Sequence, residues 1–134
     1  MSLYVDSSAL VKKYVNEPES DVARRYISST TELITARHST IEVRSTLSRV
    51  LKGKALMRAR DALAHDLAAF DFVELDRELC AAAVAIVDET PVRTLDALHI
   101  AAALRIKEPE LSFLTFDKRQ TETARNLGLT VVGA

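Results

Sequence analysis

The chain is 134 residues long, 48% of its residues are apolar, and its formal net charge is −1. A chain of this length fits one domain, residues 1–134, and it has enough apolar side chains for a continuous core. The near-zero net charge excludes binding of nucleic acid through bulk positive charge alone. The longest apolar run, Cys80–Val87, is far shorter than the roughly 20 residues of a membrane-spanning helix.

The single cysteine and the N-terminal segment indicate where the protein works. Cys80 has no partner for an internal disulfide bond, and its Ala- and Val-rich surroundings predict a position in the core. The first ten residues contain no basic start followed by a long apolar run, so they do not resemble a secretory signal. We therefore expect a cytoplasmic protein in a reducing environment.

Short apolar runs alternate with helical patterns along the whole chain. The expected strands are Leu3–Val5, Leu33–Ala36, Phe72–Leu75, Leu111–Thr115 and Thr130–Val132. The expected helices are Ser7–Tyr14, Glu19–Ser28, Ile41–Leu51, Ala55–Phe70, Arg77–Asp88, Thr94–Ile106 and Lys118–Asn126. This alternation predicts an α/β fold with a central, mainly parallel five-stranded sheet that is covered by helices on both faces.

Hydroxyl side chains and one glycine define several of the expected helix ends. Ser7 and Ser8 are expected to cap the first helix, and Ser39 and Thr40 are expected to cap the third. Gly53 is expected to stop or kink the helical stretch in which it lies.

Four carboxylates occupy unusual places in this pattern. Asp6 follows the first expected strand, and Asp117 lies just past the fourth. Glu42 and Asp96 lie in the first turns of two helices. Each has an ordinary explanation as a cap or as a charge favoured by the helix dipole. Ligands of open α/β sheets bind at the carboxyl ends of the strands, so the joint placement predicts that all four acids face one site.

Four carboxylates in one site require compensation, because like charges raise each other's pKa. A hard divalent cation provides it, and a set of oxygen ligands suits Mg²⁺ or Mn²⁺. Such a site predicts hydrolysis of a phosphodiester. Three nearby hydroxyls are expected either to orient the carboxylates or only to cap turns: Ser8, Thr94 and Thr115.

Four short motifs then resemble one known family. They are V-D-S-S-A-L at Val5–Leu10, I-E-V at Ile41–Val43, R-T-L-D-A-L-H-I-A at Arg93–Ala101, and L-T-F-D at Leu114–Asp117. In order, spacing and overall length the chain resembles the PIN domain and, within it, VapC-type ribonuclease toxins of toxin–antitoxin systems. The resemblance spans the chain from the first strand to the last.

The resemblance implies a three-layer α/β/α fold and a Mg²⁺- or Mn²⁺-dependent endoribonuclease that cuts structured RNA such as tRNA or rRNA. It places the catalytic and metal-binding acids at Asp6, Glu42, Asp96 and Asp117, with Ser8 as the hydroxyl partner of the first. It also implies a homodimer and a VapB-type antitoxin that offers an Arg to the carboxylates. Lys118 and Arg119 stand where some relatives carry a further acid, so the number of metal ions stays open.

Basic residues are concentrated near the middle of the chain. Between Val43 and Arg60 there are six basic residues and no acidic one. They either contact phosphates or form a solvated helix face. The candidate contacts to RNA or antitoxin are Lys12, Lys13, Arg44, Arg49 and Lys52.

The three histidines are expected to have minor roles. His99 lies three residues after Asp96 on one helix, which predicts a packing residue or a support at the rim of the site. His38 and His65 show no neighbours in the sequence that look like metal ligands, and the lack of a Cys–His cluster does not favour zinc.

Other classes fit the sequence less well. A phosphorelay receiver would have an adjacent acidic pair after the first strand, where only Asp6 is present. A haloacid-dehalogenase-type phosphatase would have a second Asp at the position of Ser8. The remaining alternative is a catalytically inactive, PIN-like RNA-binding or scaffold module, whose acidic quartet would normally be broken.

Overall fold

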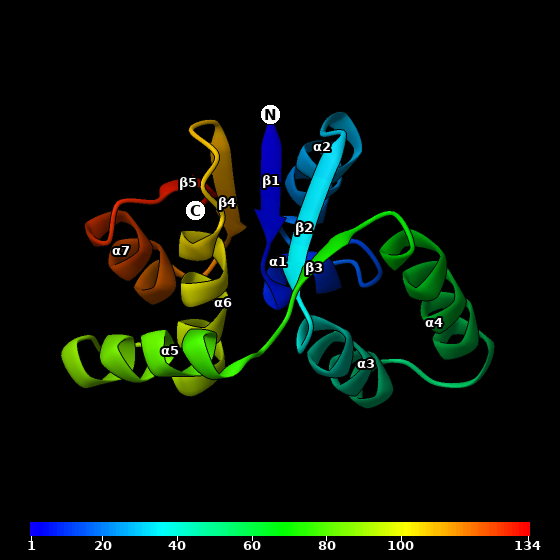
Figure 1. Cartoon of the computed structure of the whole chain (residues 1–134). Coiled ribbons are helices and arrows are strands. Elements are labelled where there is room, and N and C mark those ends of the chain that lie inside the picture. The colour runs from blue at the N-terminus through cyan, green and yellow to red at the C-terminus, as the bar shows by residue number, and fades with distance from the viewer.

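The computed structural model describes all 134 residues, which form five strands and seven helices around one sheet (Figure 1). The strands are β1 (Ser2–Val5), β2 (Glu32–Ala36), β3 (Asp71–Val73), β4 (Leu111–Thr115) and β5 (Thr130–Gly133). The helices are α1 (Ser7–Val11), α2 (Ser20–Ser29), α3 (Ser39–Val50), α4 (Gly53–Leu67), α5 (Arg77–Glu89), α6 (Thr94–Arg105) and α7 (Lys118–Asn126).

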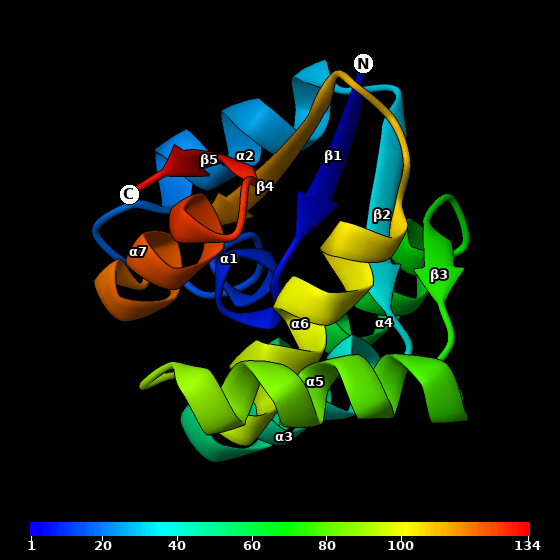
Figure 2. The same cartoon turned by 60° about the vertical axis from the view of Figure 1, so that its left-hand side comes forward.

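The sheet has the strand order β3-β2-β1-β4-β5, and every neighbouring pair is parallel. Strand β1 lies in the middle and is buried along its whole length. All strands therefore end at the same edge, where α1, α3 and α6 gather (Figure 2). This edge is where an open α/β sheet binds its ligands.

The two faces of the sheet carry separate cores, because successive side chains of a strand point to opposite faces. Tyr4 packs into a cluster with buried residues of α5, α6 and α7. Leu3 and Val5 pack into a second cluster with α1, α2, α3 and α4. The predicted three-layer α/β/α fold with a five-stranded sheet is confirmed, and the sheet is wholly parallel.

Helix α5 corrects one prediction about the core. Leu79, Ala83 and Ile86 are its buried residues, and they share one helical face. Cys80 lies about 100° further around the helix and is exposed. The prediction of a buried cysteine was wrong, because the apolar run covers the whole circumference of a helix that packs with only one side.

Several helix ends also differ from the predictions. Helix α1 is capped by Asp6, whose side chain accepts the N–H of Ala9, so Ser7 and Ser8 are its first residues and not its caps. Helix α3 begins after His38 and has no side-chain cap. Gly53 adopts a φ of 57°, which favours glycine, and starts α4. None of the helices is long and apolar enough to cross a membrane.

Candidate metal centre at the carboxyl edge of the sheet

Asp6 forms the floor of the site. It directly follows β1, is only 2% exposed, and caps α1 through a bond of 2.7 Å from Ala9 N–H to Oδ1. The hydroxyl of Thr115 donates to Oδ2 at 2.6 Å, and that of Ser8 lies 3.0 Å from both carboxylate oxygens. Burial nevertheless raises the pKa of Asp6, although the charge of His99 and these hydrogen bonds oppose the rise.

Thr115 connects Asp6 to Asp117 across two strands. Its Oγ1 donates to Asp6 and accepts the backbone N–H of Asp117 at 3.2 Å. Asp117 then caps α7 by accepting the N–H of Gln120 at 3.0 Å. The buried side chain of Gln120 donates to the backbone oxygen of Asp96 at 3.4 Å. These bonds fix the start of α7 against α6, a role for Gln120 that the sequence did not reveal.

The titration of Asp96 reflects the charges of the other three acids. Asp96 lies in the first turn of α6 and is partly buried. Burial raises its pKa to about 6, together with the charges of Asp117, Asp6 and Glu42, against the opposing effect of His99. The structure thus places the predicted acids just after β1 and β4 and in the first turns of α3 and α6, close enough for the charges of the other three to act on Asp96.

Glu42 is held from the opposite side by histidine. His99 Nε2 lies 2.8 Å from Glu42 Oε1 and 3.2 Å from the hydroxyl of Ser7. The other ring nitrogen of His99 lies 2.6 Å from the hydroxyl of the buried Tyr4. Burial acts to raise the pKa of Glu42, but the hydrogen bond and charge of His99 and the contact with Ser7 outweigh it, and the pKa is lowered.

His38 is the least expected member of this region. It is 6% exposed, its Nε2 lies 3.4 Å from Glu42 Oε1, and its ring centroid lies 4.2 Å from that of His99. Neither ring nitrogen makes a well-formed hydrogen bond, although the backbone of Leu95 is close enough to affect its titration. Burial and the neighbouring His99 lower the pKa of His38 to about 4. The prediction that His38 lacks ligand-like neighbours was wrong.

The three predicted hydroxyls differ in what they contact. Ser8 and Thr115 both bond the carboxylate of Asp6. Thr94 is an exposed first residue of α6 and is not a hydrogen-bond partner of any of the four acids. The hydroxyl that the sequence did not reveal is Ser7, which contacts His99.

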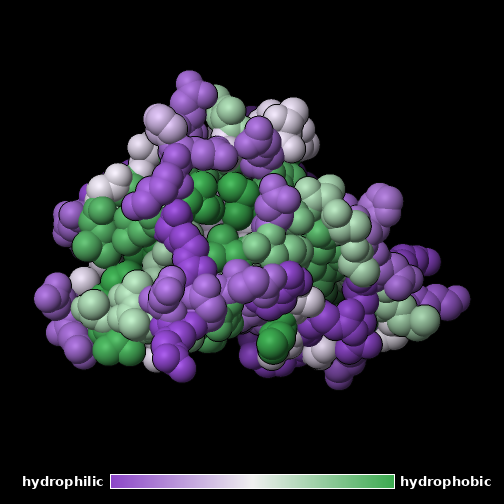
Figure 3. Space-filling view, viewed as in Figure 1, coloured by the Kyte–Doolittle hydropathy of each residue, from purple (hydrophilic) through white to green (hydrophobic).

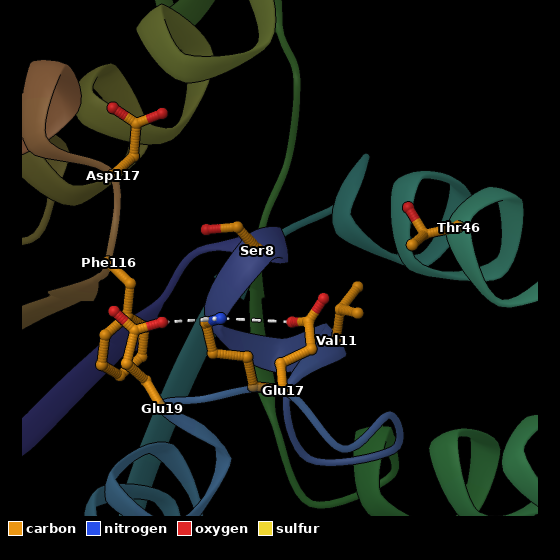
Figure 4. A pocket seen from close by; sticks show the side chains of 8 residues that line it. Ser8, Val11, Glu17, Glu19, Thr46, Phe116 and Asp117 are labelled. Carbon is orange, nitrogen blue, oxygen red and sulfur yellow. Dashed lines mark hydrogen bonds and ion pairs between the residues drawn. The ribbon is translucent and has the colours of Figure 1, made fainter. Parts of the chain in front are cut away.

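An open pocket of about 340 Å³ adjoins the acids (Figure 4). Ser8 and Asp117 line it together with Thr46 and Phe116. At its other end Lys12 lies between two carboxylates, 3.2 Å from Glu17 and 3.0 Å from Glu19.

The predicted basic contact residues fall into two groups. Lys12 pairs with carboxylates at the pocket, and Lys13 pairs with Asp66 at 2.8 Å. The remaining three are exposed on α3 or just after it: Arg44, Arg49 and Lys52.

Fold and site together define a three-layer α/β protein with an acidic centre at the carboxyl edge of a parallel sheet. The PIN domain matches residues 3–126. Ribonuclease VapC46 of Mycobacterium tuberculosis is 35% identical over 132 residues, which are 98% of this chain and 96% of the relative. The chain therefore belongs to the PIN-domain family and, within it, to the VapC-type ribonuclease toxins, as its motifs predicted.

Solved structures support the fold. FitAcB of Neisseria gonorrhoeae superposes with a TM-score of 0.76 at 16% identity, over 98% of this chain and 96% of that one. The VapC20 protein of Mycobacterium tuberculosis, a toxin that cleaves the sarcin-ricin loop, superposes with a TM-score of 0.74 at 18% identity, over 96% of both chains.

Proposed function

We propose that this protein is a Mg²⁺-dependent endoribonuclease toxin that hydrolyses phosphodiester bonds in structured RNA, of the tRNA or rRNA class. The observation that carries the proposal is the convergence of Asp6, Glu42, Asp96 and Asp117 at the sheet edge, where the charges of the other three acids help to raise the pKa of Asp96. Such acids favour a bound cation over their own protonation.

The residues present fit a hard divalent ion, Mg²⁺ or Mn²⁺. Asp6, Asp96 and Asp117 would hold it together with Glu42, because all four carry carboxylate oxygens and lie near one another. When bound, the ion would polarise a phosphodiester and activate water. Lys118 and Arg119 follow Asp117 on α7, so we propose no further acidic ligand there.

The chain's own residues prepare this site in advance. Thr115 and the N–H of Ala9 hold Asp6 in one orientation, with both carboxylate oxygens engaged. His99 fixes Glu42 on the other side. A set of carboxylates oriented before the ion arrives loses less conformational freedom on binding, which favours affinity and a defined geometry.

The RNA would approach across α3. Arg44, Arg49 and Lys52 are exposed there and free to contact phosphates. Lys12 and Lys13 already pair with carboxylates of the chain, so their contribution to RNA or antitoxin contact requires those pairs to open. We therefore propose that α3 contributes more to the salt dependence of binding than α1 does.

The proposed protein partners are a second copy of the chain and a VapB-type antitoxin. Apolar side chains gather over α5 (Figure 3), where Val84 is 57% exposed and Val87 is 37% exposed. Exposed apolar surface of this kind fits a protein interface. The acidic centre fits an Arg supplied by an antitoxin.

The direct test is cleavage of total tRNA and rRNA by the highly purified protein. We expect cleavage with Mg²⁺, none with EDTA, and none from Asp96→Asn in the presence of Mg²⁺. Asp21→Asn, which removes an exposed acid from the first turn of α2, is the matched control and should cleave normally. Undiminished cleavage by Asp96→Asn would overturn the metal-centre hypothesis. A folded wild-type protein that binds RNA without cleaving it would favour the inactive binding module.

A further inference from the structure

We propose that His38, Glu42 and His99 form a second metal site, chemically distinct from the carboxylate centre, that takes a transition-metal ion of the Zn²⁺ class. One ligand atom from each of these residues lies within 4.8 Å of the other two. The set is two imidazole nitrogens and one carboxylate oxygen, and imidazole favours Zn²⁺ and its neighbours over Mg²⁺.

The distances are close to what such an ion needs. Ligand atoms about 2.0–2.1 Å from a tetrahedral zinc ion lie roughly 3.3 Å from one another. Glu42 Oε1 lies 2.8 Å from His99 Nε2 and 3.4 Å from His38 Nε2. The ligand nitrogens of His38 and His99 lie within 4.8 Å of each other, so the three atoms must draw closer together for all of them to bind one ion.

The unsatisfied ring of His38 is an independent observation that points to a ligand. The side chain is more than nine-tenths buried, and neither ring nitrogen makes a well-formed hydrogen bond, although Glu42 Oε1 lies 3.4 Å from Nε2 and the backbone of Leu95 is close. A buried polar group without a partner costs about 1–3 kcal/mol. The ring of His38 also lies beside the imidazole of His99, which does not replace the missing hydrogen bond. A metal ion between the two rings would give His38 a ligand bond and would bind both imidazoles at once.

His99 already has the support that a metal-binding histidine requires. Its Nδ1 lies 2.6 Å from the hydroxyl of Tyr4, which is fully buried and stacks on Phe113 with ring centroids 5.3 Å apart. Without an ion, His99 Nε2–H can donate to Glu42; with an ion bound, the proton would lie on Nδ1 and be donated to Tyr4, which would free the lone pair of Nε2 for the metal. A hydrogen bond of this kind sets the tautomer and the ring orientation of metal-binding histidines.

Glu42 belongs to both sites, which gives the second site a consequence. A transition-metal ion held by His38 and His99 would draw Glu42 away from the three aspartates. We therefore expect Zn²⁺ to lower Mg²⁺-dependent RNA cleavage. This consequence rests on the proposed function, whereas the binding site itself does not.

The experiment is a calorimetric titration of the full chain with Zn²⁺ in the presence of millimolar Mg²⁺, with Co²⁺ absorption as a spectroscopic probe of nitrogen ligation. We expect one ion per chain and a Zn²⁺ affinity that falls at least tenfold in His38→Gln. His65→Gln, which removes an exposed histidine of α4, should bind as the wild type does. Asp117→Asn should also bind Zn²⁺ normally, because it alters only the carboxylate centre.

Equal Zn²⁺ affinity in His38→Gln and the wild type would overturn the proposal, as would a tenfold loss in Asp117→Asn. If His38→Gln unfolds, the wild type still decides: the ring resonances of both His38 and His99 should shift on addition of Zn²⁺, and unchanged resonances would overturn the site. Zn²⁺ binding at these rings in a protein that never cleaves RNA would contradict the proposed function and leave this site intact.

Discussion

Two aspartates with the same local structure lie in opposite electrostatic surroundings. Asp6 caps α1 and Asp76 caps α5, each by accepting the backbone N–H three residues further on. Asp76 is paired with the guanidinium of Arg105 at 2.6 Å, which holds the pKa of Asp76 down to about 2. Asp6 has no such cation, and burial raises its pKa.

The comparison shows that capping and metal binding are not alternatives. A cap fixes one carboxylate oxygen against the helix N-terminus and so determines where the other oxygen points. Whether that oxygen stabilises the fold or binds an ion depends on residues from other elements. Asp76 meets Arg105 of α6, whereas Asp6 meets Thr115 of β4 and the acidic charge of Asp96.

The largest expected difference between the two aspartates is in activity. Asp6→Asn should lower Mg²⁺-dependent RNA cleavage by about a hundredfold or more, because it removes a proposed ligand of the ion from the centre of the site. Asp76→Asn should leave cleavage within about twofold of the wild type, because Asn is an equally good cap. Initial rates on one RNA at saturating Mg²⁺ measure both. A similar loss in both variants would mean that the effect is on folding.

The hydroxyls provide a second comparison with a smaller effect. Thr115→Val removes the 2.6 Å bond to Asp6, and we expect about a 10- to 100-fold loss of Mg²⁺ affinity or activity. Thr94→Val is the matched substitution at an exposed hydroxyl that bonds none of the acids, and it should have no measurable effect. Mg²⁺ dependence of cleavage separates the two, and a loss in Thr94→Val would restore the predicted supporting role of Thr94.

The carboxylate centre should also destabilise the metal-free fold. The pKa of Asp96 is raised from 3.8 to about 6, so its charge at pH 7 opposes folding. After allowance for partial exposure, we expect Asp96→Asn to raise the free energy of unfolding by about 1–2 kcal/mol in EDTA at pH 7. Urea unfolding measures this gain. In saturating Mg²⁺ the wild type should be the more stable of the two proteins, because only the wild type binds the ion well. If Asp96→Asn were less stable than the wild type in EDTA, charge repulsion at Asp96 would not be the dominant effect.

Much of the fold followed from local patterns. The bounds predicted for β4, Leu111–Thr115, and for α7, Lys118–Asn126, agree with the structure, because a buried apolar run and an N-cap aspartate define them locally. The first helix ends at Val11 and not at Tyr14, because the next three residues form turns with i→i−3 backbone bonds, the last of them from Tyr14 N–H to the Val11 carbonyl. The Tyr14 hydroxyl also bonds Asp66 of α4 at 2.7 Å. Contacts of this kind between distant elements are not encoded in a local pattern.

In the site, too, local patterns were visible in the sequence and contacts between distant elements were not. Strand ends and first turns predicted that the four acids lie near one another at this edge of the sheet, and their metal-binding role stays a prediction. The contact of His38 with Glu42 was partly visible, because they lie four residues apart at the start of one helix. The contact of His38 with His99 was not, because it joins the start of α3 to α6, two segments about 60 residues apart in the chain.

The smallest expected effect is on the pH dependence of stability and involves Asp76. Its folded pKa of about 2 lies below the value of 3.8 that it has when unperturbed, so its contribution to stability is complete above about pH 4 and is lost as the pH falls through 2. Asp76→Asn keeps the cap but lacks this titration, and we expect a shallower loss of stability between pH 4 and pH 2 than in the wild type. Arg105→Gln should weaken the same dependence by removing the cation, although it leaves the carboxylate in place. Urea unfolding at pH 4, 3 and 2 compares the three proteins, and parallel curves would show that the Asp76–Arg105 pair is screened by solvent and contributes nothing measurable.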